Sequence, residues 1–303
     1  MGCEMSIATE NTREQWLQDR KSCIGASESP SVLGINPFKS AFQLWAEKTG
    51  LAVADDLSGN EAVEFGVRLE RPVAEAFAER TGRRVEMWPA FSLVRDPQRP
   101  YISCTPDAVQ ECDERGEGLV QIKTTSAFNA GDWVDGPPLY YQVQVQQELH
   151  VTGYSWGTLV VLIGGQKLRW FDVQRNDRFI AALLPKLDEF WRMVQQQIPP
   201  EVDGSAATAR VLARLHPDDD GSEVLLPAEA ADWTEEIEAA KAQIATAEAM
   251  KVAAENKLKA AIGSATFGLL PDGGLWSWKT QDRKGFYVEP TSFRVLRKIK
   301  TKK

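Results

Sequence analysis

Periodic apolar positions in the first 200 residues predict an alternation of helices and strands. Between residues 61 and 81 an apolar side chain recurs every four positions, from Phe65 to Phe77, and Gly82 follows where a helix would end. We therefore expect a helix over residues 61–81. The same pattern predicts helices over residues 139–152 and 179–197 and strands near residues 84–88, 91–95, 101–109, 118–124, 155–163 and 167–173. Such an order is typical of a mixed α/β fold.

The pattern changes after residue 200. Residues 201–227 are acidic and lack apolar periodicity, so we expect an irregular linker there. Residues 228–262 are rich in Ala, Glu and Lys, and an apolar seam with spacings of three and four, broken at Lys251, predicts one long helix. A short β segment with Trp and Phe is expected around residues 275–288. The seam consists of Trp233, Ile237, Ala240, Ile244, Ala247, Ala254, Leu258 and Ala261.

The expected organisation is therefore a domain over residues 1–200, an acidic linker over 201–227, and a helical arm with a β segment and a basic tail over 228–303. The chain has 303 residues, of which 43% are hydrophobic and 26% charged, as in ordinary globular proteins. No apolar run approaches the ~20 residues of a membrane span, and no secretory signal opens the chain. We expect a cytoplasmic protein with reduced thiols. The cysteines are Cys3, Cys23, Cys104 and Cys112, and the lack of a CxxC pair gives little support to a zinc site or an iron–sulfur cluster.

The net charge of −8 taken alone argues against binding to nucleic acid. The charge is unevenly distributed, however, because residues 276–303 hold nine Lys or Arg and only two Asp or Glu. This basic tail is either a solvated end or a contact to a phosphate backbone. Its clustered cations are Arg294, Arg297, Lys298, Lys300, Lys302 and Lys303.

Candidate chemistry begins with Asp107, Gln121 and Lys123. Gln121 and Lys123 are two apart on an expected strand, so their side chains leave the same face, and Asp107 follows Pro106 at the end of a strand-like stretch. A carboxylate, an amide oxygen and an ammonium that converge suit metal-assisted phosphodiester hydrolysis, because oxygen ligands hold Mg²⁺ and the lysine orients water or stabilises developing charge. The spacing by itself is weak evidence, since such residues also occur by chance.

Two predicted helices add further polar candidates. Glu70 lies at the margin of the apolar face of the helix over 61–81, where an acid either remains at the surface edge or requires a partner or a metal. Tyr141, Gln144 and Gln146 lie on the helix over 139–152. These glutamines are either solvated or reach DNA or the metal site.

Several short motifs occur in a fixed order. They are RKSCIGASE at 20–28, LGINPFKS at 33–40, LW at 44–45, EKTG at 47–50, FGVRLE at 65–70, TPD at 105–107, QIKTT at 121–125, YQVQVQ at 141–146 and VTG at 151–153. Together they resemble the phage lambda-type exonucleases, also called YqaJ-like viral recombinases, over about residues 13–200. The set in order is far more specific than any one motif.

The resemblance implies an α/β fold with a PD-(D/E)xK, restriction-endonuclease-like core, in which helices flank a central mixed sheet. It implies an enzyme that digests one strand of linear duplex DNA from the 5′ end with Mg²⁺, or Mn²⁺ as a substitute. The product would be a 3′ single strand for an annealing protein. The resemblance also implies a ring of three subunits and a phage or prophage gene expressed in a bacterial host.

The resemblance assigns a role to each matching residue. Glu70 and Asp107 would be metal ligands, Lys123 the catalytic lysine, and Tyr141 and Gln144 would support the site. The positions that would hold a terminal 5′ phosphate are Arg20, Ser27 and Thr105, and forked guanidinium and hydroxyl donors suit that anion.

Gln121 departs from the family pattern, which has Glu or Asp at this ligand position. Its amide oxygen can ligate Mg²⁺ but is neutral, so we expect weaker metal affinity. The retention of Glu70, Asp107 and Lys123 favours an active enzyme. Two alternatives remain, which are a non-catalytic module that binds DNA ends or protein, and an endonuclease or repair nuclease of the same superfamily.

Overall fold

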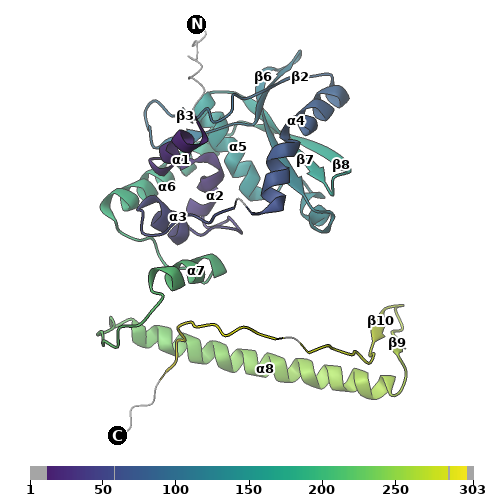
Figure 1. Cartoon of the computed structure of the whole chain (residues 1–303). Coiled ribbons are helices and arrows are strands. Elements are labelled where there is room, and N and C mark those ends of the chain that lie inside the picture. The colour runs from purple at the N-terminus through teal and green to yellow at the C-terminus, as the bar shows by residue number, and fades with distance from the viewer. Residues whose placement is uncertain (1–11, 58, 286, 299–303) are drawn as a thin grey trace. The chain divides into compact units, whose positions relative to one another are not determined.

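A computed structural model of the chain describes residues 12–57, 59–285 and 287–298. The chain divides into two compact units, Met1–His216 and Pro217–Lys303 (Figure 1), and each is described by itself. Cys3, Lys300, Lys302 and Lys303 of the sequence analysis lie outside the described residues.

A five-stranded mixed sheet forms the centre of the first unit, with the strand order β2-β5-β6-β7-β8. The pair β6–β7 is parallel and the other neighbours are antiparallel. A parallel pair requires a crossover connection, and helix α5 (Leu139–Thr152) provides it. The strands are β2 (Arg84–Met87), β5 (Ala108–Cys112), β6 (Gly116–Thr125), β7 (Trp156–Ile163) and β8 (Lys167–Gln174).

Helices cover both faces of this sheet. Val120 and Ile122 of β6 pack with helix α4 (Glu61–Thr81), whereas Leu119, one residue away, packs with α5. Because successive side chains of a strand point to opposite faces, the odd-numbered positions of β6 face α5. Gln121 and Lys123 therefore lie on the α5 side of the sheet.

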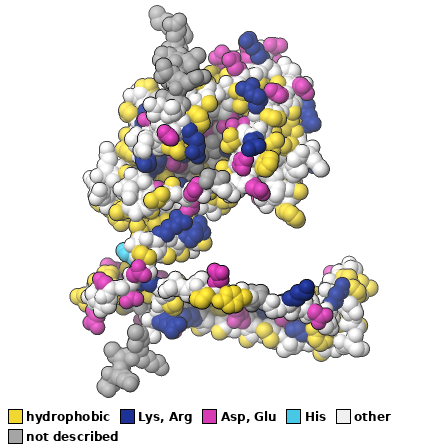
Figure 2. Space-filling model, in the orientation of Figure 1, with side chains coloured by type: hydrophobic (Ala, Val, Ile, Leu, Met, Phe, Trp, Pro, Cys, Tyr) yellow, Lys and Arg dark blue, Asp and Glu magenta, His cyan; other side chains and the backbone are white. Residues whose placement is uncertain are grey.

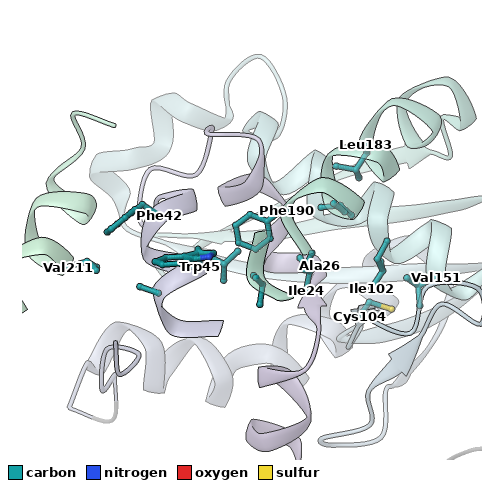
Figure 3. Close-up of a cluster of buried hydrophobic side chains, with 14 residues drawn as sticks. Ile24, Ala26, Phe42, Trp45, Ile102, Cys104, Val151, Leu183, Phe190 and Val211 are labelled. Carbon is teal, nitrogen blue, oxygen red and sulfur yellow. The ribbon is translucent and has the colours of Figure 1, made fainter. Parts of the chain in front are cut away.

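The N-terminal segment forms a second layer of elements around a small sheet of order β1-β4-β3. Its largest apolar cluster joins Ile24, Trp45 and Ile102 to Phe190 and Val211 (Figure 3). The elements are α1 (Arg13–Lys21), β1 (Ile24–Gly25), η1 (Ala26–Glu28), α2 (Ser29–Val32), α3 (Ala41–Lys48), β3 (Val94–Arg95), β4 (Ile102–Cys104), α6 (Asp177–Gln196) and α7 (Ala206–Leu215). The short helix η2 (Ala127–Trp133) packs on the main sheet instead, where Trp133 contacts Val161 and Ile163.

Most predicted elements are confirmed. The helices over 61–81 and 139–152 have the predicted bounds, and glycines with left-handed backbone, Gly82 (φ 69°) and Gly153 (φ 81°), end them. The stretch 101–109 is two strands, β4 and β5, because Pro106 lacks the N–H that a continuous ladder requires.

The expected linker over 201–227 is wrong for residues 206–215, which form α7. Ser205 caps this helix by accepting a hydrogen bond from the Thr208 N–H, and Val211 is buried in the large apolar cluster. The Thr208 hydroxyl also donates to Ser40, so contacts far away in sequence stabilise α7. The first unit accordingly extends past residue 200 to His216.

The second unit consists of a long helix and a hairpin. Helix α8 (Ala230–Ile262) has no buried residue, and strands β9 (Phe267–Leu269) and β10 (Leu275–Ser277) pair antiparallel after it. The β segment expected over 275–288 is therefore confirmed only at its first residues. Hydrophobic side chains remain on the surface of this unit (Figure 2). None of the helices in the described part of the chain has the length and apolar character needed to cross a membrane.

Candidate active site

Asp107 and Gln121 are in direct contact. Asp107 immediately precedes β5, which pairs with β6, and its Oδ2 accepts from the Gln121 Nε2 at 2.5 Å and from the Ile122 backbone N–H at 2.7 Å. Gln121 is only 4% exposed, and its Oε1 is buried with no hydrogen-bond partner. The site thus holds an acceptor oxygen that lacks a donor or a cation.

Lys123 lies beside this pair on the same face of β6. Its Nζ is 5.0 Å from the centre of the Tyr141 ring, a cation–π contact, and the Tyr141 ring stacks on Trp133. Burial, and then the neighbouring Tyr140, raise the pKa of Tyr141 above its usual value, so its hydroxyl remains protonated. Tyr141 therefore supports the ammonium group as a neutral ring.

Glu70 lies on α4, which packs on the other face of the sheet from α5. A Cβ at Gly66, one helical turn earlier, would lie 3.5 Å from the Thr124 hydroxyl, so this face of α4 lies against the end of β6. Burial, and then the charge of Asp107, raise the pKa of Glu70 to about 7, while Lys123 acts in the opposite direction. Glu70, Asp107 and Lys123 therefore interact electrostatically.

Glu148 is a further acidic residue beside the site, and it stands outside the motifs quoted above. It is 1% exposed on α5, its Oε1 accepts from the Gln144 Nε2 at 2.9 Å, and its Oε2 is buried without a partner. Burial, and then the charge of Asp107, raise the pKa of Glu148 to about 8. The sequence feature that could have identified Glu148 is its position four residues after Gln144, which places both side chains on the same face of the helix.

Gln146 does not belong to the site. Its Nε2 donates to the Gln174 carbonyl at 2.7 Å and its Oε1 accepts from the Asn176 N–H at 2.8 Å. It therefore ties α5 to the end of β8, and only Gln144 of the two candidate glutamines faces the acidic cluster.

The donor chemistry fits a hard divalent cation. Among the described residues no group of three His, Cys, Asp or Glu side chains lies close enough to hold a metal ion. Gln121, however, would add a neutral oxygen ligand beside Asp107, because its Oε1 is buried and lacks a partner. Burial raises the pKa of Asp107 as well, so a cation would relieve the cost of the charged carboxylates. Asp107, Gln121 and Glu70 are the residues that would hold it.

A second polar cluster brings together the three residues expected to hold a 5′ phosphate. The Arg20 guanidinium donates to Ser27 Oγ at 3.4 Å and lies over the Trp16 ring, 4.8 Å from its centre. The Trp16 Nε1 in turn donates to Thr105 Oγ1 at 3.2 Å. Thr105 is two residues before Asp107, so one short segment connects this cluster to the acidic site.

An ion triad with the largely buried side chains of Glu28 and Lys48 fixes the partly exposed Arg20. Glu28 accepts from Arg20 at 3.2 Å through Oε1, and its Oε2 accepts from Lys48 Nζ and from the Gly25 N–H, both at 2.8 Å. The Lys48 Nζ also donates to the Arg20 carbonyl at 2.7 Å. Burial alone would raise the pKa of Glu28, but Lys48 and Arg20 outweigh it and hold the pKa at about 2. Glu28 and Lys48 lie in the motifs RKSCIGASE and EKTG, but the motif pattern assigns neither of them a role.

The chain is similar in sequence to known proteins. The family model of the YqaJ-like viral recombinase domain matches residues 15–155. The protein YqaJ of Bacillus subtilis (strain 168) is 32% identical over 267 residues, which cover 86% of this chain and 82% of YqaJ.

Solved structures show the same fold. The crystal structure of the alkaline exonuclease LHK-Exo from Laribacter hongkongensis matches with a TM-score of 0.50 and 19% identity, over 67% of this chain and 100% of that one. LHK-Exo in complex with dAMP matches over the same shares with a TM-score of 0.52 and 21% identity. The expected α/β fold with a PD-(D/E)xK core is confirmed. The chain belongs to the YqaJ-like viral recombinase family.

Proposed function

We propose that the protein is a metal-dependent DNA exonuclease that digests one strand of linear duplex DNA from its 5′ end. The observation that supports this proposal most is the hydrogen bond between Gln121 and Asp107, with Lys123 on the same face of β6. Asp107 is also only two residues from Thr105, which belongs to the Arg20 cluster. The 3′ single strand left behind would pass to an annealing protein. A ring of three subunits would keep the enzyme on its substrate.

In this proposal Asp107, Gln121 and Glu70 hold Mg²⁺, with Mn²⁺ as a substitute. A bound Mg²⁺ supplies a water of lowered pKa and shields the charge of the phosphodiester. Lys123, supported by the Tyr141 ring, orients the attacking water or stabilises charge developing on the phosphate oxygens. Gln144 restrains the carboxylate of Glu148 through its hydrogen bond.

The Arg20 cluster supports the proposed polarity. Arg20, Ser27 and Thr105 would bind the terminal 5′ phosphate through a guanidinium and two hydroxyls. Because Trp16 contacts both Arg20 and Thr105, it would hold these donors in one place. A phosphate bound there sets which scissile bond reaches Asp107.

A non-catalytic module that binds DNA ends is the second candidate. It is favoured by the Gln121 amide, which donates to Asp107 and so satisfies this carboxylate without a metal. Such a module would bind ends with salt-sensitive affinity and release no nucleotide.

The test is digestion of linear duplex DNA labelled at the 5′ or the 3′ end, with Mg²⁺ or Mn²⁺. We expect loss of the 5′ label first, and no loss for Asp107→Ala or Lys123→Ala. Strand loss that vanishes in Asp107→Ala excludes the binding module. Absence of strand loss with either metal at high protein concentration refutes the enzyme, and cleavage of covalently closed circles indicates an endonuclease instead.

A further inference from the structure

Helix α8 carries a heptad repeat along one stripe, apolar at every a and d position except Lys251. From Trp233 to Ala261 the seam advances in alternating steps of four and three residues, the 3.5-residue period of a coiled coil. In heptad terms the a positions are Ile237, Ile244, Lys251 and Leu258, and the d positions are Trp233, Ala240, Ala247, Ala254 and Ala261. Large residues thus occupy one row and mainly alanines the other.

In the described part of the second unit this stripe is exposed except at Leu258, which is partly buried. Trp233 is 52% exposed and Ile244 is 58% exposed. The apolar residues of the C-terminal segment are themselves exposed, with Tyr287 at 82% and Leu296 at 94%, so this segment does not cover the stripe. A helix with an apolar stripe normally obtains its stability from packing that stripe against a partner.

We propose that the stripe of α8 pairs with α8 of a second copy of this chain as an antiparallel coiled coil. In an antiparallel pair each a position faces a d position. The first three a residues therefore each face an alanine, and the last one, Leu258, faces Trp233 near the start of the partner helix. The register that pairs all four a positions gives the layers Ile237–Ala254, Ile244–Ala247, Lys251–Ala240 and Leu258–Trp233, each formed twice. The large side chains at the a positions of one helix then fill the space beside the alanines of the other helix.

The flanking charges complement each other in this register. At the g positions Glu236 faces Lys257 of the second copy, and at the e positions Lys241 faces Glu248. Two-fold symmetry repeats both pairs, which gives four attractive pairs and none of like charge. Exposed ion pairs contribute little strength, so these pairs decide orientation more than affinity.

A parallel pair fits less well. It would place Lys251 against Lys251 in the core and alanine against alanine at four d layers. Its only attractive flanking pair is Glu236 with Lys241. The sequence of α8 therefore selects the antiparallel arrangement.

The test is the mass of the full chain by sedimentation over a range of concentrations. We expect Ile244→Asp to lower the association by at least about 100-fold, because it places a charge in a core layer. Circular dichroism at the same concentrations measures how much of the α8 helix depends on the partner. Association through the first unit would remain in this variant, so only the difference from the parent chain reports on α8. Equal masses at all concentrations overturn the proposal, including the case in which the C-terminal segment covers the stripe.

Charge reversal tests the orientation without touching the core. Lys257→Glu should weaken association by about tenfold, since two attractive pairs become repulsive, and Glu236→Lys combined with Lys257→Glu should restore it. Glu235→Lys, on the outer face of the same helix, is the matched control and should leave the mass unchanged. A Lys257→Glu chain that associates like its parent, or a double variant that stays weak, overturns the antiparallel register.

Discussion

The Gln121 side-chain amide donates a hydrogen bond to the Asp107 carboxylate at 2.5 Å. An acidic residue at this position would instead place a second negative charge against Asp107, and a cation would be required between them. The amide therefore stabilises the metal-free site. The same amide leaves its Oε1 buried and without a partner, and this is the oxygen that the proposed Mg²⁺ would bind.

Gln121→Glu should make the stability of the fold depend more strongly on bound metal and should raise the affinity for Mg²⁺. Without metal, repulsion between the new carboxylate and Asp107 should lower the free energy of unfolding by about 1–3 kcal/mol. With metal, the added charge should lower the Mg²⁺ concentration for half-maximal activity by about tenfold. The measurements are thermal unfolding with EDTA or Mg²⁺, and a metal titration of digestion and of binding by calorimetry.

Gln18→Glu is the matched control, since Gln18 is exposed on α1 and the substitution adds the same charge away from the site. If both variants keep the metal titration and the unfolding temperature of the parent chain, Gln121 is not a metal ligand.

Glu148→Gln should make the metal-free protein more stable at alkaline pH. Because the pKa of Glu148 is raised to about 8 in the folded protein, ionisation favours the unfolded chain, and stability falls as pH rises from the ordinary glutamate pKa of about 4.5 toward 8. A neutral amide removes this penalty. In EDTA the unfolding temperatures of parent and variant should agree near pH 4 and differ by several degrees at pH 9. A difference that is constant across this range contradicts an elevated pKa.

The spacing of apolar residues predicted those helices and strands that are determined by their own sequence. The helix over 61–81 follows from four-residue spacing and from Gly82, and the shared face of Gln121 and Lys123 follows from the two-residue period of a strand. The contact of Asp107 with Gln121 then required only that β5 pair with β6.

Features that depend on distant contacts were not predictable in this way. Helix α7 is stabilised by the bond from Thr208 to Ser40, which lies 168 residues earlier. Glu148 and Gln147 are buried because α5 packs between the main sheet and the small sheet, where Gln147 donates to the carbonyls of Ile24 and Ser103. Periodicity identifies one buried face of a helix, and it does not show that a second face is also covered.

Glu28→Gln should destabilise the fold in a pH-dependent manner. It leaves Arg20 and the buried Lys48 without their carboxylate, which should cost about 3–5 kcal/mol at neutral pH. Because the folded pKa is about 2, the contribution of Glu28 is present above its unfolded pKa of about 4.5 and is lost as pH falls toward 2. Urea unfolding at pH 7 and pH 3 measures both values. The difference between parent and variant should shrink at pH 3, and an equal difference at both values contradicts the triad.

Arg20→Lys should separate recognition of the 5′ phosphate from catalysis. Lysine keeps the charge but loses the forked donors and the contact with the Trp16 ring. We expect the KM for duplex DNA with a 5′ phosphate to rise about tenfold, by about 1.4 kcal/mol of lost binding, while the KM for the same duplex with a 5′ hydroxyl stays unchanged. Arg13→Lys, which is exposed at the start of the same helix, serves as the control and should alter neither value. If Arg20→Lys affects both substrates equally, Arg20 contributes to the fold or to general DNA binding, and the polarity of digestion must have another origin.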